Sequence, residues 1–351
     1  MRALLLVLFL PGCFLPAEKR ARLDRSVGEA EAGGITLEVA EGRAGIRSFD
    51  GLRAELWAQA PSLSISVRSD APRPLVLDVL NCMPGTLLRV DAEAPRAPTP
   101  VAGRAASCHF ELAVSDSQLE LAPAAADTEY AFAVLSDVQD AIGRVQDIYR
   151  RMNADPELQF VVSTGDLVET GTRSQLVHFQ DELAGLNIPL FSTVGNHEMG
   201  APPSHWHSLF GPFNVNFVHR GVTFSLVDSG NATIDPSMYG RLDDWLDAAE
   251  DGTHIVLTHV PPLDPAGLRG GAFRSRKEAA KLVQKLGRGR VDALFLGHIH
   301  SYYSFSVADV PTYISGGGGA IQERFDGIER HYLKVRASAR GIEDVAIVRV
   351  D

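Results

Sequence analysis

Five short apolar runs in the sequence are each followed by Asp, Asn or His. The runs read AFAVLSDVQ, FVVSTGDLVE, LFSTVGNHE, HIVLTH and ALFLGHIH, and they supply Asp137, Asp166, Asn196, His259, His298 and His300. Runs of this length and composition are typical of buried β-strands. Because open α/β sheets bind ligands beyond the carboxyl ends of their strands, we expect these side chains to converge.

Two carboxylates, an amide and three imidazoles form a suitable ligand set for two divalent cations. A carboxylate can bridge two ions, imidazole suits Zn and Fe, and an amide oxygen is a neutral ligand. Each motif alone has a simpler interpretation, since a Gly-Asp pair is often only a turn and a buried His is often hydrogen-bonded in a core. Their repeated position after an apolar run favours a metal site.

The elements that must position these residues alternate between strand and helix from Tyr130 onward. Apolar periodicity predicts helices over 141–153, 173–186, 240–250 and 277–286, between the apolar runs. Hairpins are expected at 215–229 and near the C-terminus. Near-continuous apolar strands that alternate with helices predict an α/β fold with sheets buried on both faces.

The blocks D-x-Q, G-D-x-x, G-N-H-E, a lone H and G-H-x-H resemble the signature of the calcineurin-like metallophosphoesterase superfamily, over residues 130 to about 320. The resemblance implies a four-layer α/β/β/α sandwich with two divalent metal ions, Mn, Fe or Zn. It implies that one ion is bound by Asp137, Asp166 and His300, and that Asp166 bridges to a second ion bound by Asn196, His259 and His298.

The same resemblance implies hydrolysis of phosphate monoesters or diesters. A hydroxide that bridges the two ions would attack phosphorus, with Asp166 as the bridging ligand. Two ions about 3.5–4 Å apart can clamp the phosphoryl oxygens and acidify such a water. His197, which follows Asn196, would contact the phosphate or protonate the leaving oxygen, oriented by a neighbouring acid. Asn196 and His197 are therefore also candidate substrate-binding residues.

Gln139 is the position at which the chain departs from the family pattern, because the first family motif normally ends in His. Gln139 can offer an amide oxygen to the metal or hold a water molecule. Either arrangement is expected to weaken the first metal site and to shift it toward harder ions such as Mn. Glu169 stands where purple acid phosphatases carry Tyr, so no ferric tyrosinate centre is expected.

The substrate is expected to be a phosphorylated small molecule or another phosphoester. In the loop 261–276, Arg269 is the first candidate to bind its phosphate, and a solvated basic loop is the alternative. The segment His205–His207 could line the substrate cleft or form a surface turn. With 33 basic and 44 acidic residues, the net charge is −11, which disfavours a nuclease and nucleic acid as a partner.

The N-terminus MRALLLVLFLPGC reads as a signal peptide over residues 1–12 that ends at a lipobox Cys13. Cys13 would then carry the lipid, and the protein would be exported and anchored to a bacterial membrane in the cell envelope. The alternative is cleavage after Ala17, which would leave a soluble periplasmic or secreted protein. The charged, Ala- and Glu-rich stretch of residues 13–32 is expected to be a tether.

Residues 33–127 contain seven short runs with period-2 alternation, separated by turn residues. This pattern predicts a small all-β domain, an immunoglobulin- or fibronectin-like sandwich, before a catalytic domain over residues 128–351. Two cysteines, Cys82 and Cys108, lie in this stretch. In an oxidising compartment we expect them to form a disulfide, and two unpaired thiols are the alternative.

A second function remains open, namely a degenerate phosphoesterase fold that acts as a binding or scaffold module. Gln139 would then be the first ligand lost from a decaying site. Decay is also expected to alter Asn196, His197 or the G-H-x-H block, and all of these are intact. The retained residues favour an enzyme.

Overall fold

The computed structural model describes residues 17–350 except 102, 125–129, 201, 203, 268–269 and 323–326. The expected signal peptide, the lipobox residue Cys13 and the candidate Arg269 lie outside the described residues. Among the described helices, none combines the length and the apolar character that crossing a bilayer requires.

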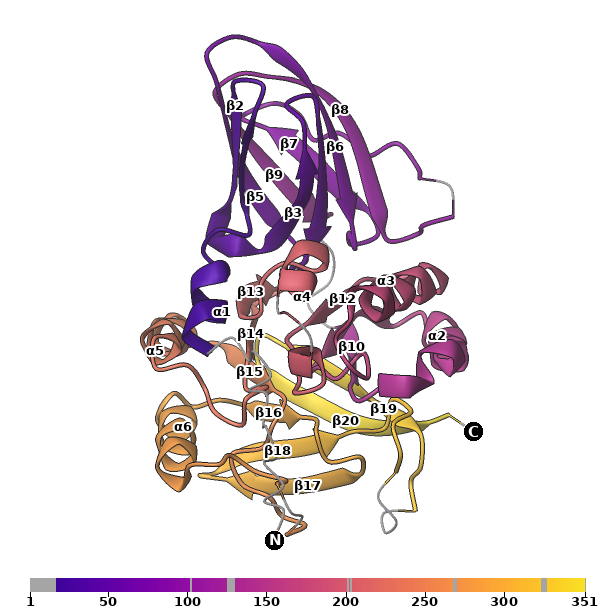
Figure 1. Cartoon of the computed structure of the whole chain (residues 1–351), viewed down its shortest axis with the longest axis vertical. Helices are drawn as coiled ribbons and strands as arrows, with labels where there is room; N and C mark the ends of the chain where they lie inside the picture. Colours follow the sequence, from indigo (N-terminus) through magenta and orange to yellow (C-terminus); the bar gives the residue numbers. More distant parts are fainter. Residues whose placement is uncertain are drawn as a thin grey trace, which may run out of the picture.

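Nine strands between residues 29 and 123, called here the β-region, lie together at one end of the molecule (Figure 1). They are β1 Glu29–Ala32, β2 Ile35–Val39, β3 Ala44–Phe49, β4 Arg53–Ala58, β5 Leu63–Ser69, β6 Arg73–Leu80, β7 Thr86–Val90, β8 Ser107–Val114 and β9 Ser117–Pro123. They form two sheets, ordered β1-β2-β5-β9-β7 and β3-β4-β6-β8. Alternate residues of β2, β5 and β8 are buried, as expected when one face of each sheet covers a core.

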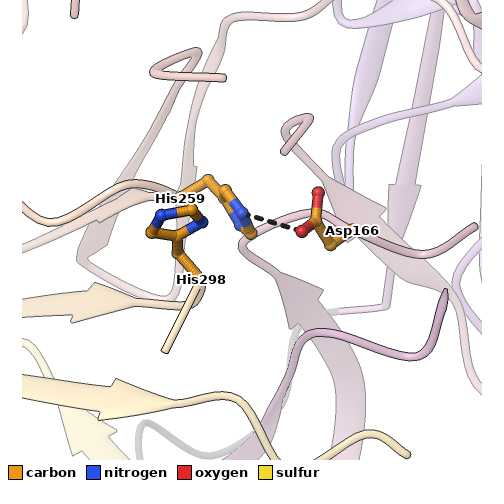
Figure 2. A group of neighbouring side chains, drawn as sticks. All are labelled: Asp166, His259 and His298. Carbon is orange, nitrogen blue, oxygen red and sulfur yellow. Dashed lines mark ion pairs between the residues drawn. The ribbon is translucent and has the colours of Figure 1, made fainter. Parts of the chain in front are cut away.

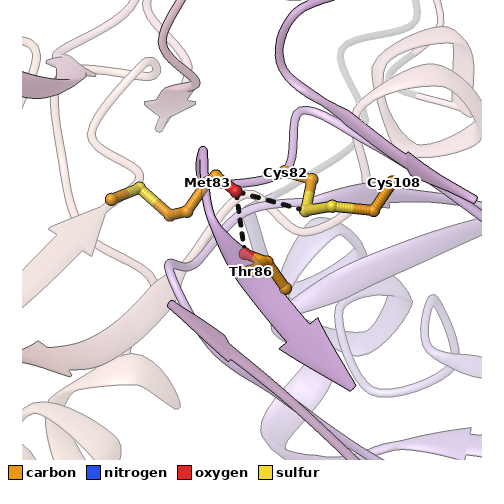
Figure 3. Close-up of a disulfide and its surroundings, with 4 residues drawn as sticks. All are labelled: Cys82, Met83, Thr86 and Cys108. Atoms are coloured by element: carbon orange, nitrogen blue, oxygen red, sulfur yellow. Dashed lines mark hydrogen bonds between the residues drawn. A yellow bond between two sulfur atoms is a disulfide. The ribbon is translucent and has the colours of Figure 1, made fainter. Parts of the chain in front are cut away.

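Cys82 and Cys108 lie next to each other in the β-region, with a Cα–Cα distance of 6.1 Å and their sulfur atoms joined (Figure 3). Cys82 follows β6, and Cys108 lies in the adjacent strand β8. The backbone around the pair is fixed by Thr86, whose hydroxyl donates to the carbonyl oxygen of Met83 at 2.8 Å. The link therefore joins two neighbouring strands where they leave the sheet.

The remainder of the chain forms two further sheets. The first contains β10 Tyr130–Leu135, β11 Leu158–Ser163, β12 Leu190–Ser192, β19 His331–Ser338 and β20 Gly341–Arg349, in the order β12-β11-β10-β19-β20. The second contains β13 Val215–His219, β14 Val222–Val227, β15 Thr253–Thr258, β16 Ala293–Leu296, β17 Tyr302–Val307 and β18 Val310–Ser315, in the order β13-β14-β15-β16-β18-β17. Strands β10–β12 run parallel to one another, as do β14, β15, β16 and β18.

The α-helices and short 3₁₀ turns connect these strands. The α-helices are α1 Ala17–Leu23, α2 Gln146–Asn153, α3 Arg173–Glu182, α4 Ser204–Leu209, α5 Met238–Ala248 and α6 Arg276–Arg288. The 3₁₀ turns are η1 Ala40–Gly42, η2 Gln139–Arg144, η3 Leu183–Gly185 and η4 Glu198–Gly200. The four helices expected from periodicity are present as α2, α3, α5 and α6, with boundaries that differ by a few residues.

The two sheets pack face to face through aromatic side chains. Phe132 of the first sheet contacts Phe224 of the second edge-to-face, with ring centroids 5.1 Å apart. On the outer face of the first sheet, α2 and α3 bury apolar residues such as Ile148 and Phe179. On the outer face of the second, α5 and α6 bury residues such as Leu242. The layer order is therefore helix, sheet, sheet, helix (Figure 1).

The segment expected to be a tether is folded over residues 17–32, which form α1 and β1. Arg20 is fully buried, and its Nε lies 2.7 Å from Oδ2 of Asp228. Asp24, also buried, accepts hydrogen bonds from the backbone N–H groups of Phe213 and Asn214. The expectation was wrong for these residues because their charged side chains have partners more than 180 residues away, which local composition does not reveal.

The β-region is attached to the edge strand β12 by side chains that take the place of a neighbouring strand. Asn81 donates to the carbonyl oxygen of Leu190 at 2.7 Å and accepts from the backbone N–H of the same residue at 2.8 Å. Gln59 accepts from the N–H of Ser192 at 2.9 Å. Because an edge strand otherwise exposes unpaired backbone groups, these contacts cover it.

Candidate metal centre

The expected ligands lie where five parallel strands end. Asp137 follows β10, Asp166 follows β11 and Asn196 follows β12, so that all three come from the first sheet. His259 follows β15 of the second sheet, and His298 and His300 follow β16. Because the two sheets pack face to face, their strand ends bring the six side chains to a common edge.

The backbone turns sharply at three of these residues and at Gln139. Positive φ angles occur at Asp137 (60°), Gln139 (49°), Asp166 (52°) and His298 (71°). Residues other than Gly adopt this left-handed region at a cost of about 1–3 kcal/mol, and such residues cluster at functional sites. The turns aim side chains back over the strand ends.

Glycines allow the strand ends to approach closely. A Cβ atom added at Gly195 would lie 2.1 Å from Oδ1 of Asp166. One added at Gly297 would lie 2.2 Å from Oγ of Ser136 and 2.7 Å from Oδ2 of Asp137. Any larger residue at either position would therefore displace an expected metal ligand.

Asp166, His259 and His298 form one compact group, with candidate ligand atoms all within 4.8 Å of one another (Figure 2). Nε2 of His259 lies 3.1 Å from Oδ2 of Asp166 and 3.1 Å from Oδ1 of Asn196. Nε2 of His298 lies 3.0 Å from the carbonyl oxygen of Gly270, to which it donates, so its Nδ1 is the available ligand atom.

The remaining expected ligands lie on the other side of Asp166. Nε2 of His300 is 3.4 Å from Oδ1 of Asp137 and 3.1 Å from Nε2 of Gln139. The Gln139 amide also contacts Oδ2 of Asp166 at 3.3 Å. Nδ1 of His300 donates to the carbonyl oxygen of Ile321 at 2.7 Å, which leaves Nε2 free to bind a cation. Gln139 thus occupies the position between Asp137, Asp166 and His300.

His197 lies beside this group and is held from two sides. Its backbone N–H donates to Oδ1 of Asp166 at 2.8 Å. Its Nδ1 is 2.6 Å from the carbonyl oxygen of Glu169 and 3.5 Å from Oε2 of the same residue. Nδ1 therefore carries a proton, while Nε2 lies 3.9 Å from Oδ2 of Asp166. Glu169 is the acid that orients His197.

Glu198 organises the loops around the site and was not assigned a role from the sequence. Its buried carboxylate accepts hydrogen bonds from four backbone N–H groups, those of Asp166, Leu167, Val168 and Gly195. Burial, with a contribution from the adjacent Asp166, raises the pKa of Glu198 to about 7. Glu198 is the last residue of the G-N-H-E block, but only the tertiary structure reveals its partners.

A cleft of about 660 Å³ opens beside Asn196. It is lined by the 230–233 loop, by Met199, and by Arg274 and Ser275 just before α6. The segment His205–His207 does not line it: Trp206 is buried and stacks on Phe210, with centroids 4.4 Å apart, and Nε2 of His207 donates to the carbonyl oxygen of Leu23.

Comparison with known proteins agrees with this geometry. The sequence of residues 130–302 matches the family described as calcineurin-like phosphoesterase. This chain carries a calcineurin-like phosphoesterase domain. The match ends just after the G-H-x-H block and so contains all six expected ligands and Gln139.

Two curated relatives are similar to the phosphoesterase domain. A 3′,5′-cyclic-nucleotide phosphodiesterase from Nostoc sp. is 24% identical over 162 residues, which are 42% of this chain and 58% of the relative. A "Probable cyclic nucleotide phosphodiesterase" from Rhodopseudomonas palustris is 26% identical over 194 residues, which are 51% of this chain and 70% of the relative. The chain thus spans little more than half of the Nostoc protein.

Among solved structures, the fold resembles a Plasmodium protein described as GAP50, the anchor in the inner membrane complex. The TM-score is 0.50 at 14% identity, and the likeness covers 64% of this chain and 86% of the other. The structure of PhoD gives a TM-score of 0.49 at 11% identity, over 83% of this chain and 87% of the other. At these identities the likeness concerns the fold alone.

The residues of the phosphoesterase domain fit divalent cations. Nδ1 of His259 is buried and has no hydrogen-bond partner within the part of the chain that the structure describes. The other ring nitrogen, Nε2, lies 3.1 Å from both Oδ2 of Asp166 and Oδ1 of Asn196 and is the ligand atom that His259 offers. His259 is also supported from behind, since its backbone N–H donates to Oγ of Ser229 at 3.0 Å. Carboxylate, imidazole and amide ligands in this proportion suit Mn, Fe or Zn.

The charges in the phosphoesterase site are those of a metal-binding cluster. Burial alone would raise the pKa of Asp166, but the neighbouring His259 and His197 lower it to about 2. Burial alone would lower the pKa values of His259 and His300, but Asp166 and Asp137 respectively raise both to about 9. In the metal-free chain these imidazoles are protonated at neutral pH, and a bound cation would replace the protons.

Proposed function

We propose that the chain is a metal-dependent hydrolase of phosphate esters, with phosphodiesters as its main substrates. The observation that carries the proposal is the convergence of Asp137, Asp166, Asn196 and the three histidines at the ends of five parallel strands. Both curated relatives are named as cyclic-nucleotide phosphodiesterases, which supports a phosphodiester, including a cyclic nucleotide, over a monoester.

Two cations would be held by the residues on either side of Asp166. Asp137, Gln139 and His300 would hold the first, and Asn196, His259 and His298 the second, with Asp166 shared between them. Bound there, the cations would neutralise phosphoryl charge and supply a nucleophilic water at neutral pH. Asp166 suits the shared position because its Oδ2 lies 3.3 Å from Nε2 of Gln139 on one side and 3.1 Å from Nε2 of His259 on the other.

His197 would act on the substrate and not on the cations. The contact between its Nδ1 and the carbonyl oxygen of Glu169 fixes the tautomer, so that Nε2 faces the centre. When doubly protonated, His197 could donate from Nε2 to a phosphoryl oxygen or to the leaving alkoxide. Glu169 would stabilise that charge, since its Oε2 lies 3.5 Å from Nδ1.

The first cation would be bound more weakly than the second. The structure supports this through Gln139, whose amide nitrogen contacts both His300 and Asp166, where a histidine would present a ring nitrogen. An amide oxygen is a neutral and weaker ligand, and it favours hard ions such as Mn over Zn.

The competing function is a scaffold or binding module that no longer hydrolyses anything. The position of His197 against Glu169 speaks against it, because binding alone does not require an oriented proton donor beside the metal ligands. The buried carboxylate of Glu198, with its four backbone donors, also retains the loop geometry that an active centre needs.

Export and a lipid anchor on Cys13 remain part of the proposal. Labelling cells with a clickable fatty acid, with and without Cys13→Ala, tests it: label on the parent chain alone supports the anchor. Label on neither chain, together with release of the protein in soluble form, would favour cleavage after Ala17.

The proposed activity is tested by hydrolysis of bis(4-nitrophenyl) phosphate and 4-nitrophenyl phosphate, with Mn, Fe, Zn or Mg added in turn. Asn196→Ala serves as the control, because it removes one ligand without altering a strand. We expect metal-dependent turnover, faster with the diester, that the substitution abolishes. The proposal fails if no metal gives turnover, or if Asn196→Ala is as active as the parent chain.

A further inference from the structure

The cleft beside Asn196 has a charged residue, Arg274, in its lining. The guanidinium of Arg274 lines the cleft, and in the described portion of the chain no hydrogen bond or ion pair to it is found. Arg274 is exposed and lies beside the candidate metal centre of a chain whose net charge is −11. Arg269, the arginine first considered from the sequence, lies outside the described residues.

The backbone fixes the position from which Arg274 extends. Its N–H donates to the carbonyl oxygen of Ala232 at 3.1 Å, which ties it to the 230–233 loop, another part of the cleft lining. The preceding Phe273 is buried, and its N–H donates to the carbonyl oxygen of Pro261. The following Ser275 caps α6 by accepting from the N–H of Glu278. The exposed side chain of Arg274 thus extends from a backbone that is hydrogen-bonded on both sides.

The loop over residues 228–233 is tied to the metal centre. Asp228 accepts from the N–H of Gly230 at 2.9 Å, and Ser229 accepts from the N–H of the expected ligand His259. Gly230 lies against the carbonyl oxygen of Gly195, since a Cβ added to it would be 2.6 Å from that atom. The cleft is therefore continuous with the metal centre. An ester whose phosphoryl group is held at the centre would place its substituent in the cleft.

The lining of the cleft has the mixed character that a nucleoside requires. Met199 and Ala232 supply apolar surface, while Asn231, Thr233 and Ser275 supply amide and hydroxyl groups. A nucleobase has flat faces of low polarity and an edge of hydrogen-bond acceptors, and a ribose carries hydroxyls. A volume of about 660 Å³ lies within the range of small-molecule sites and exceeds what a phosphate ion needs.

From these observations we propose that the cleft binds the nucleoside part of a nucleotide substrate, and that Arg274 determines this specificity by donating to its acceptor groups. This inference rests on the proposed function, because it places the phosphate of the same molecule at the metal centre. Arginine suits the role because its planar fork can donate two parallel hydrogen bonds and can also stack on a base.

The test is a binding measurement that does not depend on turnover. Binding of adenosine 5′-monophosphate and of inorganic phosphate to the Mn-loaded full chain is measured by calorimetry for the parent, Arg274→Ala, Arg274→Lys and Arg276→Ala. Arg276 is a matched control, since it is exposed, lies two residues away and does not line the cleft. Arg274 is also exposed, so its replacement leaves the fold intact.

We expect Arg274→Ala to raise the Kd of adenosine 5′-monophosphate about tenfold or more and to leave the Kd of phosphate unchanged. Arg274→Lys should fall between the parent and Arg274→Ala, and Arg276→Ala should match the parent. The inference is overturned if the parent binds the nucleotide no more tightly than phosphate, or if Arg274→Ala binds it as the parent does. If Arg274→Ala weakens nucleotide binding and the parent chain hydrolyses no ester, the proposed function is contradicted instead.

Discussion

His259 shows how the centre is built at the scale of single residues. Its Nε2 contacts Asp166 and Asn196, and its backbone is held by Ser229. Three separate loops thus determine where one imidazole lies. Sequence order alone predicted that His259 follows a strand, but its contacts depend on how two sheets pack, and no local pattern contains that information.

The same limit explains which functional residues the sequence revealed. The ligand candidates were found because each follows an apolar run in a repeated way. Glu198 was not assigned, because its significance lies in partners that only the tertiary structure brings to it. Arg274 was one of three arginines noted in the loop 261–276, and only the structure places it in the lining of the cleft. The local signal for Glu198, an acidic residue after G-N-H, is compatible with an exposed turn.

Replacing Gln139 by histidine is predicted to tighten the first cation site. A ring nitrogen would take the place of the amide between Asp137, Asp166 and His300, and imidazole is the stronger ligand for Zn and Fe. After gel filtration in metal-free buffer, elemental analysis should find fewer than two ions per parent chain and about two per Gln139→His chain. Two firmly held ions in the parent chain would show that Gln139 does not weaken the site.

Replacing His197 by alanine is predicted to lower kcat by about 10²–10⁴-fold for esters with poor leaving groups. The loss should be much smaller with bis(4-nitrophenyl) phosphate, because 4-nitrophenolate leaves without a proton. Metal content should not change, since His197 is not a candidate ligand. An equal loss with both classes of ester would contradict the role of His197 as a proton donor.

At the scale of elements, the sequence predicted a strand correctly wherever alternate residues along it are buried. All seven period-2 runs of the β-region are strands, whereas β1 and β3 were missed. Their burial patterns, exposed or mixed along much of their length, explain the omission. The tether was predicted wrongly over residues 17–32 because a charged sequence can still fold when distant residues pair with its charges.

Helix α1 provides a test of that correction. Arg20→Met is predicted to destabilise the chain by about 3–5 kcal/mol, because it leaves Asp228 buried without its cationic partner. Chemical denaturation measures the change. Arg22→Met is the matched control: Arg22 pairs with Glu18 on the surface, and surface pairs of this kind contribute about 0–1 kcal/mol. Equal stability of both variants would mean that α1 is not part of the folded core.

At the scale of the whole molecule, the β-region and the phosphoesterase domain are joined by more than a linker. Asn81 and Gln59 cover the edge of β12, and Trp57 contacts Phe210 with ring centroids 5.2 Å apart. No single-residue pattern in the sequence predicts these contacts, because each partner lies more than 100 positions away. The β-region therefore has a role in supporting the first sheet.

The Cys82–Cys108 link is predicted to form in an oxidising compartment and to stabilise this end of the molecule. Closing a loop with a sequence separation of 26 contributes about 3–4 kcal/mol in the chain-entropy model. The denatured chain should react with iodoacetamide at these two cysteines only after reduction, and reduction should lower the denaturation midpoint. Alkylation of both without a reductant would establish two free thiols.

The proposed hydrolysis requires two cations that act together across Asp166. The most direct measurement adds Mn²⁺ stepwise to the metal-free chain and follows bound ions and turnover of bis(4-nitrophenyl) phosphate in the same sample. We predict that turnover stays low while the first equivalent of Mn²⁺ fills the tighter site. Turnover should then rise as the second equivalent fills the weaker site. Full turnover with one ion or none, or two bound ions without any turnover, would contradict a dinuclear hydrolase.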